Sequence, residues 1–118
     1  MAVNEKIQRL VSDLLAATET GRVRWEDTAD ENTFRTSLRS GMVQVGKSAA
    51  PPEEEGMDAC HQVSLFDRRG RLIEELTVPA LKGWEELAHL FEAARRSARK
   101  TDEVLDQILA EIKSGGQR

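Results

Sequence analysis

The chain has 118 residues and a mass of 13.2 kDa, of which 39% are hydrophobic, so it can build one modest core in a single domain spanning 1–118. Its 17 Lys and Arg are outnumbered by 21 Asp and Glu, and a net charge of -4 disfavours the phosphate contacts that nucleic acids and anionic membranes require. No apolar run is long enough to cross a bilayer, the first residues lack the order of a signal peptide, and the lone Cys60 cannot form an internal disulfide, which together predict a cytoplasmic protein.

The first segment predicts an amphipathic helix. Its apolar residues are spaced by three and four positions, as on one face of a helix: Val3, Ile7, Leu10, Val11, Leu14 and Leu15. We expect Asn4 to cap the start of this helix and Gly21 to end it. A charged connector over 21–32, which contains Trp25, leads to the next element.

The middle of the chain changes to an alternating pattern that predicts four strands, over 34–38, 42–46, 61–65 and 72–77. Short turns over 39–41, with Gly41 in the left-handed conformation, and over 67–70 make these strands an antiparallel meander. The order LIEEL in the fourth strand breaks alternation and indicates an edge strand, a bulge or a register other than the one assumed. Two prolines and three glutamates predict an exposed, mobile loop over about 48–58.

Helical spacing returns after Pro79 and continues almost to the frayed tail expected over 114–118. Thr101 is the expected N-cap of a last helix, but whether 99–101 is a break or a kink stays open. The predicted fold is therefore α+β, with an N-terminal helix, a four-stranded antiparallel meander and one C-terminal helix or two, packed on one sheet face. The expected core comprises Leu10, Leu14, Phe34, Leu38, Val43, Val45, Val63, Leu65, Ile73, Leu87, Phe91, Leu105 and Ile108.

Residues suited to catalysis are few. Cys60 and His61 are neighbours in a predicted strand, so their side chains point to opposite faces and cannot act as a nucleophilic pair. A hydrolase using His61 or His89 with a carboxylate has the weakest support. Phosphate-binding glycine motifs and metal-ligand spacings are absent from the sequence, so we expect no catalytic residues, no metal site and no cofactor.

Three residues are candidates for ligand binding. Trp25 stands in a charged connector, and tryptophan is frequent in binding sites. Arg95 and Arg99 belong to a basic cluster at the end of a helix, where cations also complement the helix dipole. They support an alternative function, a small-molecule or anion-binding module with a basic pocket near Arg95 and Arg99.

The leading hypothesis is an adaptor or chaperone-like domain that binds another protein and has no catalytic activity. The first helix, the segment from Trp84 to Phe91 and the last helix each present a wide apolar surface, more than one thin sheet can cover. We therefore expect a homodimer, with Leu105, Ile108 and Ile112 of the last helix as contacts. The overall pattern resembles small stand-alone bacterial domains and indicates no particular family.

Overall fold

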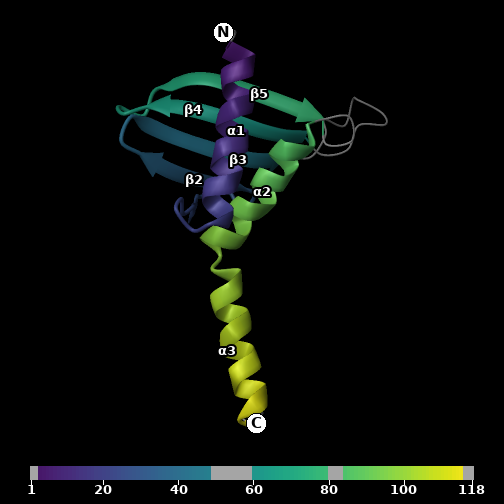
Figure 1. The fold of residues 1–118 in the computed structure, drawn as a ribbon. Helices are drawn as coiled ribbons and strands as arrows, with labels where there is room; N and C mark the ends of the chain where they lie inside the picture. Colours follow the sequence, from purple (N-terminus) through teal and green to yellow (C-terminus); the bar gives the residue numbers. More distant parts are fainter. Residues whose placement is uncertain (1–2, 49–59, 80–83, 116–118) are drawn as a thin grey trace.

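The computed structural model describes residues 3–48, 60–79 and 84–115, in which three helices and five strands follow one another. Figure 1 shows them in the order α1 (Val3–Glu19), β1 (Glu26–Asp27), β2 (Thr33–Leu38), β3 (Gly41–Ser48), β4 (Cys60–Asp67), β5 (Leu72–Pro79), α2 (Glu85–Ala98) and α3 (Thr101–Lys113). The strands form one antiparallel sheet in the order β1-β2-β3-β4-β5. The α+β fold is thus confirmed, and the short β1 extends the predicted four-stranded meander to five strands.

The strand register decides which side chains face the helices. Val45 lies opposite Phe34 on one side and Val63 on the other, and Val63 lies opposite Leu76, so these four side chains share one face. Phe34 and Val45 are fully buried there. The period-two pattern in the sequence therefore identified the buried face of β2, β3 and β4 correctly.

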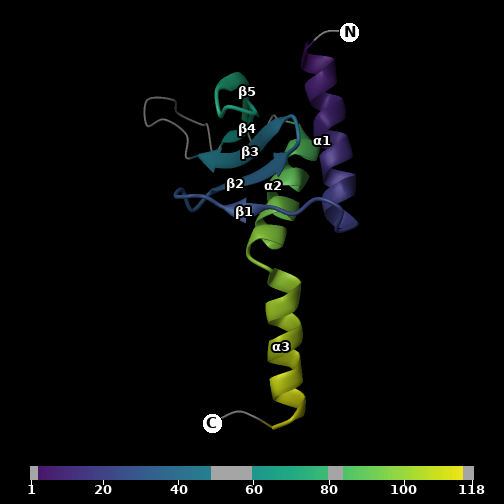
Figure 2. The ribbon, with the colours of Figure 1, turned by 90° about the vertical axis from the view of Figure 1, so that its left-hand side faces the viewer.

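Two helices cover that face, and the opposite face has no described helix on it (Figure 2). α2 lies on the sheet, and α1 packs against α2 on the side away from the strands. The core combines one apolar stripe from each helix with the inner sheet face, and its buried members are Ile7, Val11, Leu14, Trp25, Phe34, Val43, Val45, Val63, Leu87, Leu90, Phe91 and Ala94.

The glycines and caps agree only in part with the expectations. Gly21, two residues after the end of α1, has a φ of 78° and ends that helix, as predicted. Gly41 was expected in the left-handed region, but it lies in β3 between Leu38 and Asp67 and needs no positive φ. The two caps were also wrong, because α1 already includes Asn4 and α3 already includes Thr101.

β5 is an edge strand, and its register shifts where Leu65 and Phe66 pair with it, as the broken alternation indicated. Two expected core residues are exposed instead, at the end of the sheet that carries the β2-β3 and β4-β5 turns. Leu38 is 46% exposed and Ile73 is 62% exposed. Both stand near the turns that join strands, beyond the part of the sheet that α1 and α2 cover.

The chain breaks between α2 and α3. Lys100 adopts a φ of 52°, a left-handed conformation that redirects the backbone, and α3 then extends away from the rest of the molecule (Figure 1). No residue of α3 is buried, so the expected core positions of Leu105 and Ile108 were wrong. The radius of gyration is 16.6 Å, whereas a compact domain of this length has about 13–14 Å.

Two of the expectations concern segments that lie wholly or partly outside the described residues. The loop predicted over about 48–58 lies outside the described residues, except for Ser48 at the end of β3. Of the tail over 114–118, only Ser114 and Gly115 are described. Gly115, which follows the C-cap Ser114 of α3, has a φ of 68°, as expected for a glycine that stops a helix.

Candidate interaction surfaces

The exposed large hydrophobic side chains of the described residues fall on only two surfaces. Five of them lie on α3, and three lie near the turns at one end of the sheet. Isolated exposed apolar residues are ordinary in proteins, but groups of them mark surfaces that contact something else. These two groups are therefore the places to look for function.

We call the first group the α3 stripe. It consists of Val104 (46% exposed), Leu105 (50%), Ile108 (46%), Leu109 (57%) and Ile112 (68%). Their spacing places them on one side of the helix, because residues three and four positions apart are neighbours on a helix surface. The predicted contact residues Leu105, Ile108 and Ile112 form the middle of this stripe.

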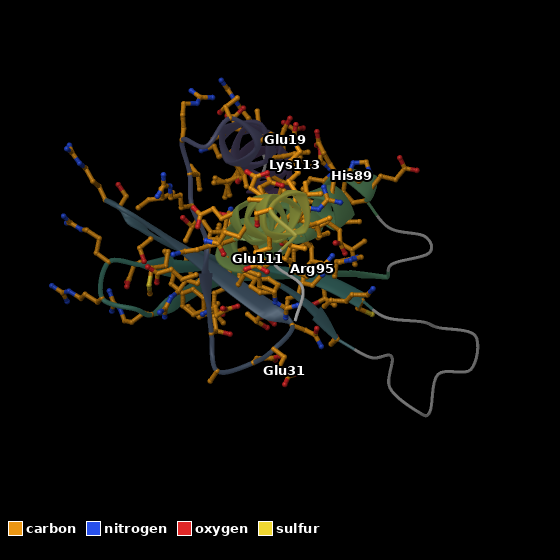
Figure 3. All side chains as sticks on the ribbon, turned by 90° about the horizontal axis from the view of Figure 1, so that it is seen from below. Glu19, Glu31, His89, Arg95, Glu111 and Lys113 are labelled. Atoms are coloured by element: carbon orange, nitrogen blue, oxygen red, sulfur yellow. The ribbon has the colours of Figure 1, made fainter. Side chains whose placement is uncertain are left out.

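The polar side chains of α3 complete an amphipathic helix. Figure 3, which looks along α3, shows Glu111 and Lys113 on opposite sides of it. Four carboxylates and one lysine make α3 acidic as a whole: Asp102, Glu103, Asp106, Glu111 and Lys113. An amphipathic helix with its apolar stripe in water is a surface that a partner can stabilise by covering it.

Trp25 is a structural residue of the core. Its side chain is 3% exposed, its indole Nε1 donates a hydrogen bond of 2.9 Å to Thr18 Oγ1, and its backbone N–H donates one of 3.0 Å to Ser97 Oγ. These contacts join the end of α1, the connector and the end of α2. Trp25 therefore holds three segments together, with little surface left for a ligand.

The two candidate arginines are occupied by contacts within the chain. Arg95 forms an ion pair of 2.6 Å with Glu92, one turn earlier in α2. Arg99 donates a hydrogen bond of 2.9 Å to the carbonyl oxygen of Glu31, and its guanidinium stands 5.4 Å from the ring centre of Phe34. Both arginines thus have partners that tie α2 to itself and to the sheet.

A groove of about 480 Å³ opens beside these residues, where α1 ends and α3 begins. Trp25, Arg96 and Lys100 line it, but Arg95 and Arg99 do not, and its wall also carries Glu19, Asp102 and Glu103. Seen along α3, Glu19 and Arg95 lie on opposite sides of that helix (Figure 3). The structure therefore does not bring Trp25, Arg95 and Arg99 together around one basic pocket, and the groove has mixed charge.

His61 is buried on the helix side of the sheet, with its ring centre 5.6 Å from that of Phe91. Burial lowers the pKa of His61 below its ordinary value of 6.5, and the charge of Lys47 lowers it further, while Glu92 acts in the opposite direction. Its neighbour Cys60 is also buried, but the register places it on the other sheet face. Cys60 and His61 are thus separated, as predicted.

Because His61 is buried, we expect the free energy of unfolding to depend on pH. Because the folded state binds the proton more weakly than the unfolded chain, stability is complete above pH 6.5 and falls as the pH drops from 6.5 towards the lower pKa of the folded state. The free energy of unfolding should change by at most about 1.4 kcal/mol per pH unit, the value for the uptake of one proton. Denaturant unfolding of the chain should show this loss between pH 7.5 and pH 5.

A matched pair of variants isolates this effect. His61→Phe keeps a ring against Phe91 and removes the titrating group, so its stability should change less between the two pH values. His89→Gln removes the other histidine, which is exposed on α2, and should keep the pH dependence of the unmodified chain. An equal pH dependence in all three proteins would contradict the assignment to His61.

The described residues were also compared with the requirements of a metal site and of a membrane-spanning helix. Within 3–48, 60–79 and 84–115, no group of three or more His, Cys, Asp or Glu side chains is placed to hold a metal ion. None of the described helices combines the length and the apolar composition needed to cross a bilayer.

No protein-family model, no curated protein and no solved structure significantly matches the chain.

Proposed function

We propose that this chain is a cytoplasmic protein-interaction module without catalytic activity, which works as a homodimer joined through α3. The observation that carries the proposal is the α3 stripe, whose five side chains stand in solvent on a helix that projects from the folded body. A single cysteine, free and buried, supports a reducing compartment.

The spacing of the stripe suits an antiparallel pair of α3 helices. Leu105, Ile108 and Ile112 are separated by three and four residues, the repeat with which helices pack along a shared seam. In an antiparallel pair centred between Ile108 and Leu109, Leu105 of one copy lies opposite Ile112 of the other, and the reverse contact forms as well. The same patch therefore serves both copies, as a two-fold dimer requires.

Burial of the stripe in such a pair contributes free energy that can be compared with the cost of association. Burying a large aliphatic side chain completely contributes about 1.5–3 kcal/mol, and the stripe residues are about half exposed. Five of them on each of two copies then contribute roughly 8–15 kcal/mol, against an association cost of about 4–15 kcal/mol. The two ranges overlap, so burial of the stripe can offset the cost of association, and the dissociation constant is the quantity to measure.

A pair of double variants tests the proposal. Leu105→Glu with Ile112→Glu places two charges in the stripe, whereas Gln107→Glu with Ala110→Glu adds the same two charges on the opposite side of α3. Sedimentation equilibrium at micromolar concentration should give the 13.2 kDa monomer for the first variant and a dimer for the second. Because α3 buries no residue, both should keep the circular dichroism spectrum of the folded chain. Equal masses for the two variants would contradict the proposed contact.

A further inference from the structure

The second group of exposed hydrophobic residues lies where both long hairpins of the sheet turn. Leu72 is 54% exposed and Ile73 is 62% exposed, and the register aligns Leu72 with Phe66 and Met42 across β5, β4 and β3. This row lies on the sheet face that carries no described helix. We call Leu38, Met42, Phe66, Leu72 and Ile73 the hairpin-end surface. Leu38 belongs by alternation to the helix side of the sheet, and it joins this surface at the end of the β2-β3 hairpin, where it lines the same hollow as Met42.

The hairpin-end surface contains a hollow between the two turns. The hollow measures about 360 Å³, and Leu38 and Met42 provide its apolar wall. Arg39 of the β2-β3 turn and Arg68 of the β4-β5 turn also line it. The hollow therefore offers apolar contact and two cationic groups within one small site.

The charge around the hollow is opposite to that of the whole chain. Arg39, Arg68, Arg69 and Arg71 stand at the two turns with one carboxylate, Asp67, whereas the chain has a net charge of -4. The backbone N–H of Arg71 lowers the pKa of Asp67, and the Arg71 side chain, whose Nε lies 2.9 Å from Asp67 Oδ2, lowers it further. The other three arginines form no ion pair with any described carboxylate.

We propose that the hairpin-end surface binds an acidic amphipathic segment of a partner protein. The apolar side chains of such a segment would cover Leu72 and Ile73 and enter the hollow, while its carboxylates would pair with Arg39, Arg68 and Arg69. This proposal rests on the proposed function in one respect, since it describes the protein partner that the interaction module binds. It uses no residue of α3 and is independent of the dimer.

Two other classes of partner fit the surface less well. A flat anionic membrane would also approach Glu74 and Glu75, which directly follow Ile73 and are exposed, so it would meet repulsion that a narrow peptide avoids. Single-stranded nucleic acid is held by aromatic rings as well as cations. Phe66 is the sole aromatic side chain of the surface, and it is half-buried.

The test measures fluorescence anisotropy of a labelled synthetic peptide with leucine at helical spacing and glutamate elsewhere. The unmodified chain should bind it, and should bind a second peptide with lysine in place of glutamate at least about tenfold more weakly. Arg39→Glu with Arg68→Glu, and separately Leu72→Ser with Ile73→Ser, should each weaken binding of the acidic peptide about tenfold or more. Lys6→Glu with Arg9→Glu makes the same charge change on exposed positions of α1 and should bind like the unmodified chain.

Further measurements separate this proposal from its alternatives. The α3 variant with Leu105→Glu and Ile112→Glu should bind the acidic peptide like the unmodified chain, whether or not the dimer exists. The proposal is overturned by equal binding of both peptides, by no binding at millimolar peptide, or by loss of binding in the α3 variant alone. Binding to phosphatidylserine vesicles without binding to the acidic peptide would also overturn it and indicate a membrane surface.

Discussion

Replacing Phe34 with alanine should lower the free energy of unfolding by about 3–5 kcal/mol, the usual cost of removing a buried phenylalanine from a core. Phe34 is completely buried, and its ring centre lies 5.6 Å from that of Phe91. The variant would leave a cavity between the sheet and α2, and it would also remove the ring below the Arg99 guanidinium. Denaturant unfolding at a fixed protein concentration measures the effect, since a dimer makes stability depend on concentration.

Leu38→Ala is the matched control for this prediction. Leu38 ends the same strand as Phe34 and follows the same alternation, but it is 46% exposed. Its replacement should cost less than about 1 kcal/mol. Comparable losses in both variants would show that the covered part of the sheet extends to the end of β2, contrary to the structure.

Replacing Gly41 with alanine should destabilise the chain by about 1–3 kcal/mol through overpacking. A Cβ atom built on Gly41 would overlap the backbone carbonyl oxygen of Phe66 in the neighbouring strand. A backbone atom cannot turn aside as a flexible side chain can, so β3 and β4 must separate at this end. The strain comes from this close approach, since the φ of Gly41 is not in the left-handed region.

The neighbouring Ser40→Ala serves as the control for Gly41. Ser40 is exposed in the turn before β3, so its replacement should change the free energy of unfolding by less than about 0.5 kcal/mol. If Gly41→Ala is as stable as Ser40→Ala, the two strands are farther apart at this point than the structure shows.

The periodicity of the sequence predicted most of the architecture. Alternation of two identified the inner faces of β2, β3 and β4, and spacings of three and four identified the helical segments, although they left open whether the last segment forms one helix or two. The two-residue strand β1 escaped detection, because Glu26 and Asp27 are exposed and carry no apolar pattern. Its position follows from its pairing with Phe34 and Arg35 in β2, which is information that a local pattern does not contain.

Errors in the predicted core have one physical cause. A pattern of apolar residues shows which side of an element is apolar, but not whether another element covers that side. Leu38 and Leu105 follow apolar patterns like those of the buried residues, yet Leu38 stands at the end of β2 beside a turn, and Lys100 directs Leu105 away from the body. The same apolar α3 pattern therefore also suggested the contact surface that the structure leaves exposed.

The candidate binding residues differ in how far the sequence could place them. The pairing of Arg95 with Glu92 is visible from their separation of three residues on one helix. The contact of Arg99 with Glu31, and that of Trp25 with Ser97, join residues about seventy positions apart and appear only in the folded chain. The hairpin-end surface was hidden for the same reason, since Arg39 and Arg68 come from different turns.

Sedimentation equilibrium of the unmodified chain tests the central claim most directly. We expect a mass near twice 13.2 kDa at tens of micromolar, which falls towards 13.2 kDa on dilution as the α3 pair separates. A mass of 13.2 kDa throughout the micromolar range would contradict the homodimer and leave the α3 stripe uncovered by a second copy.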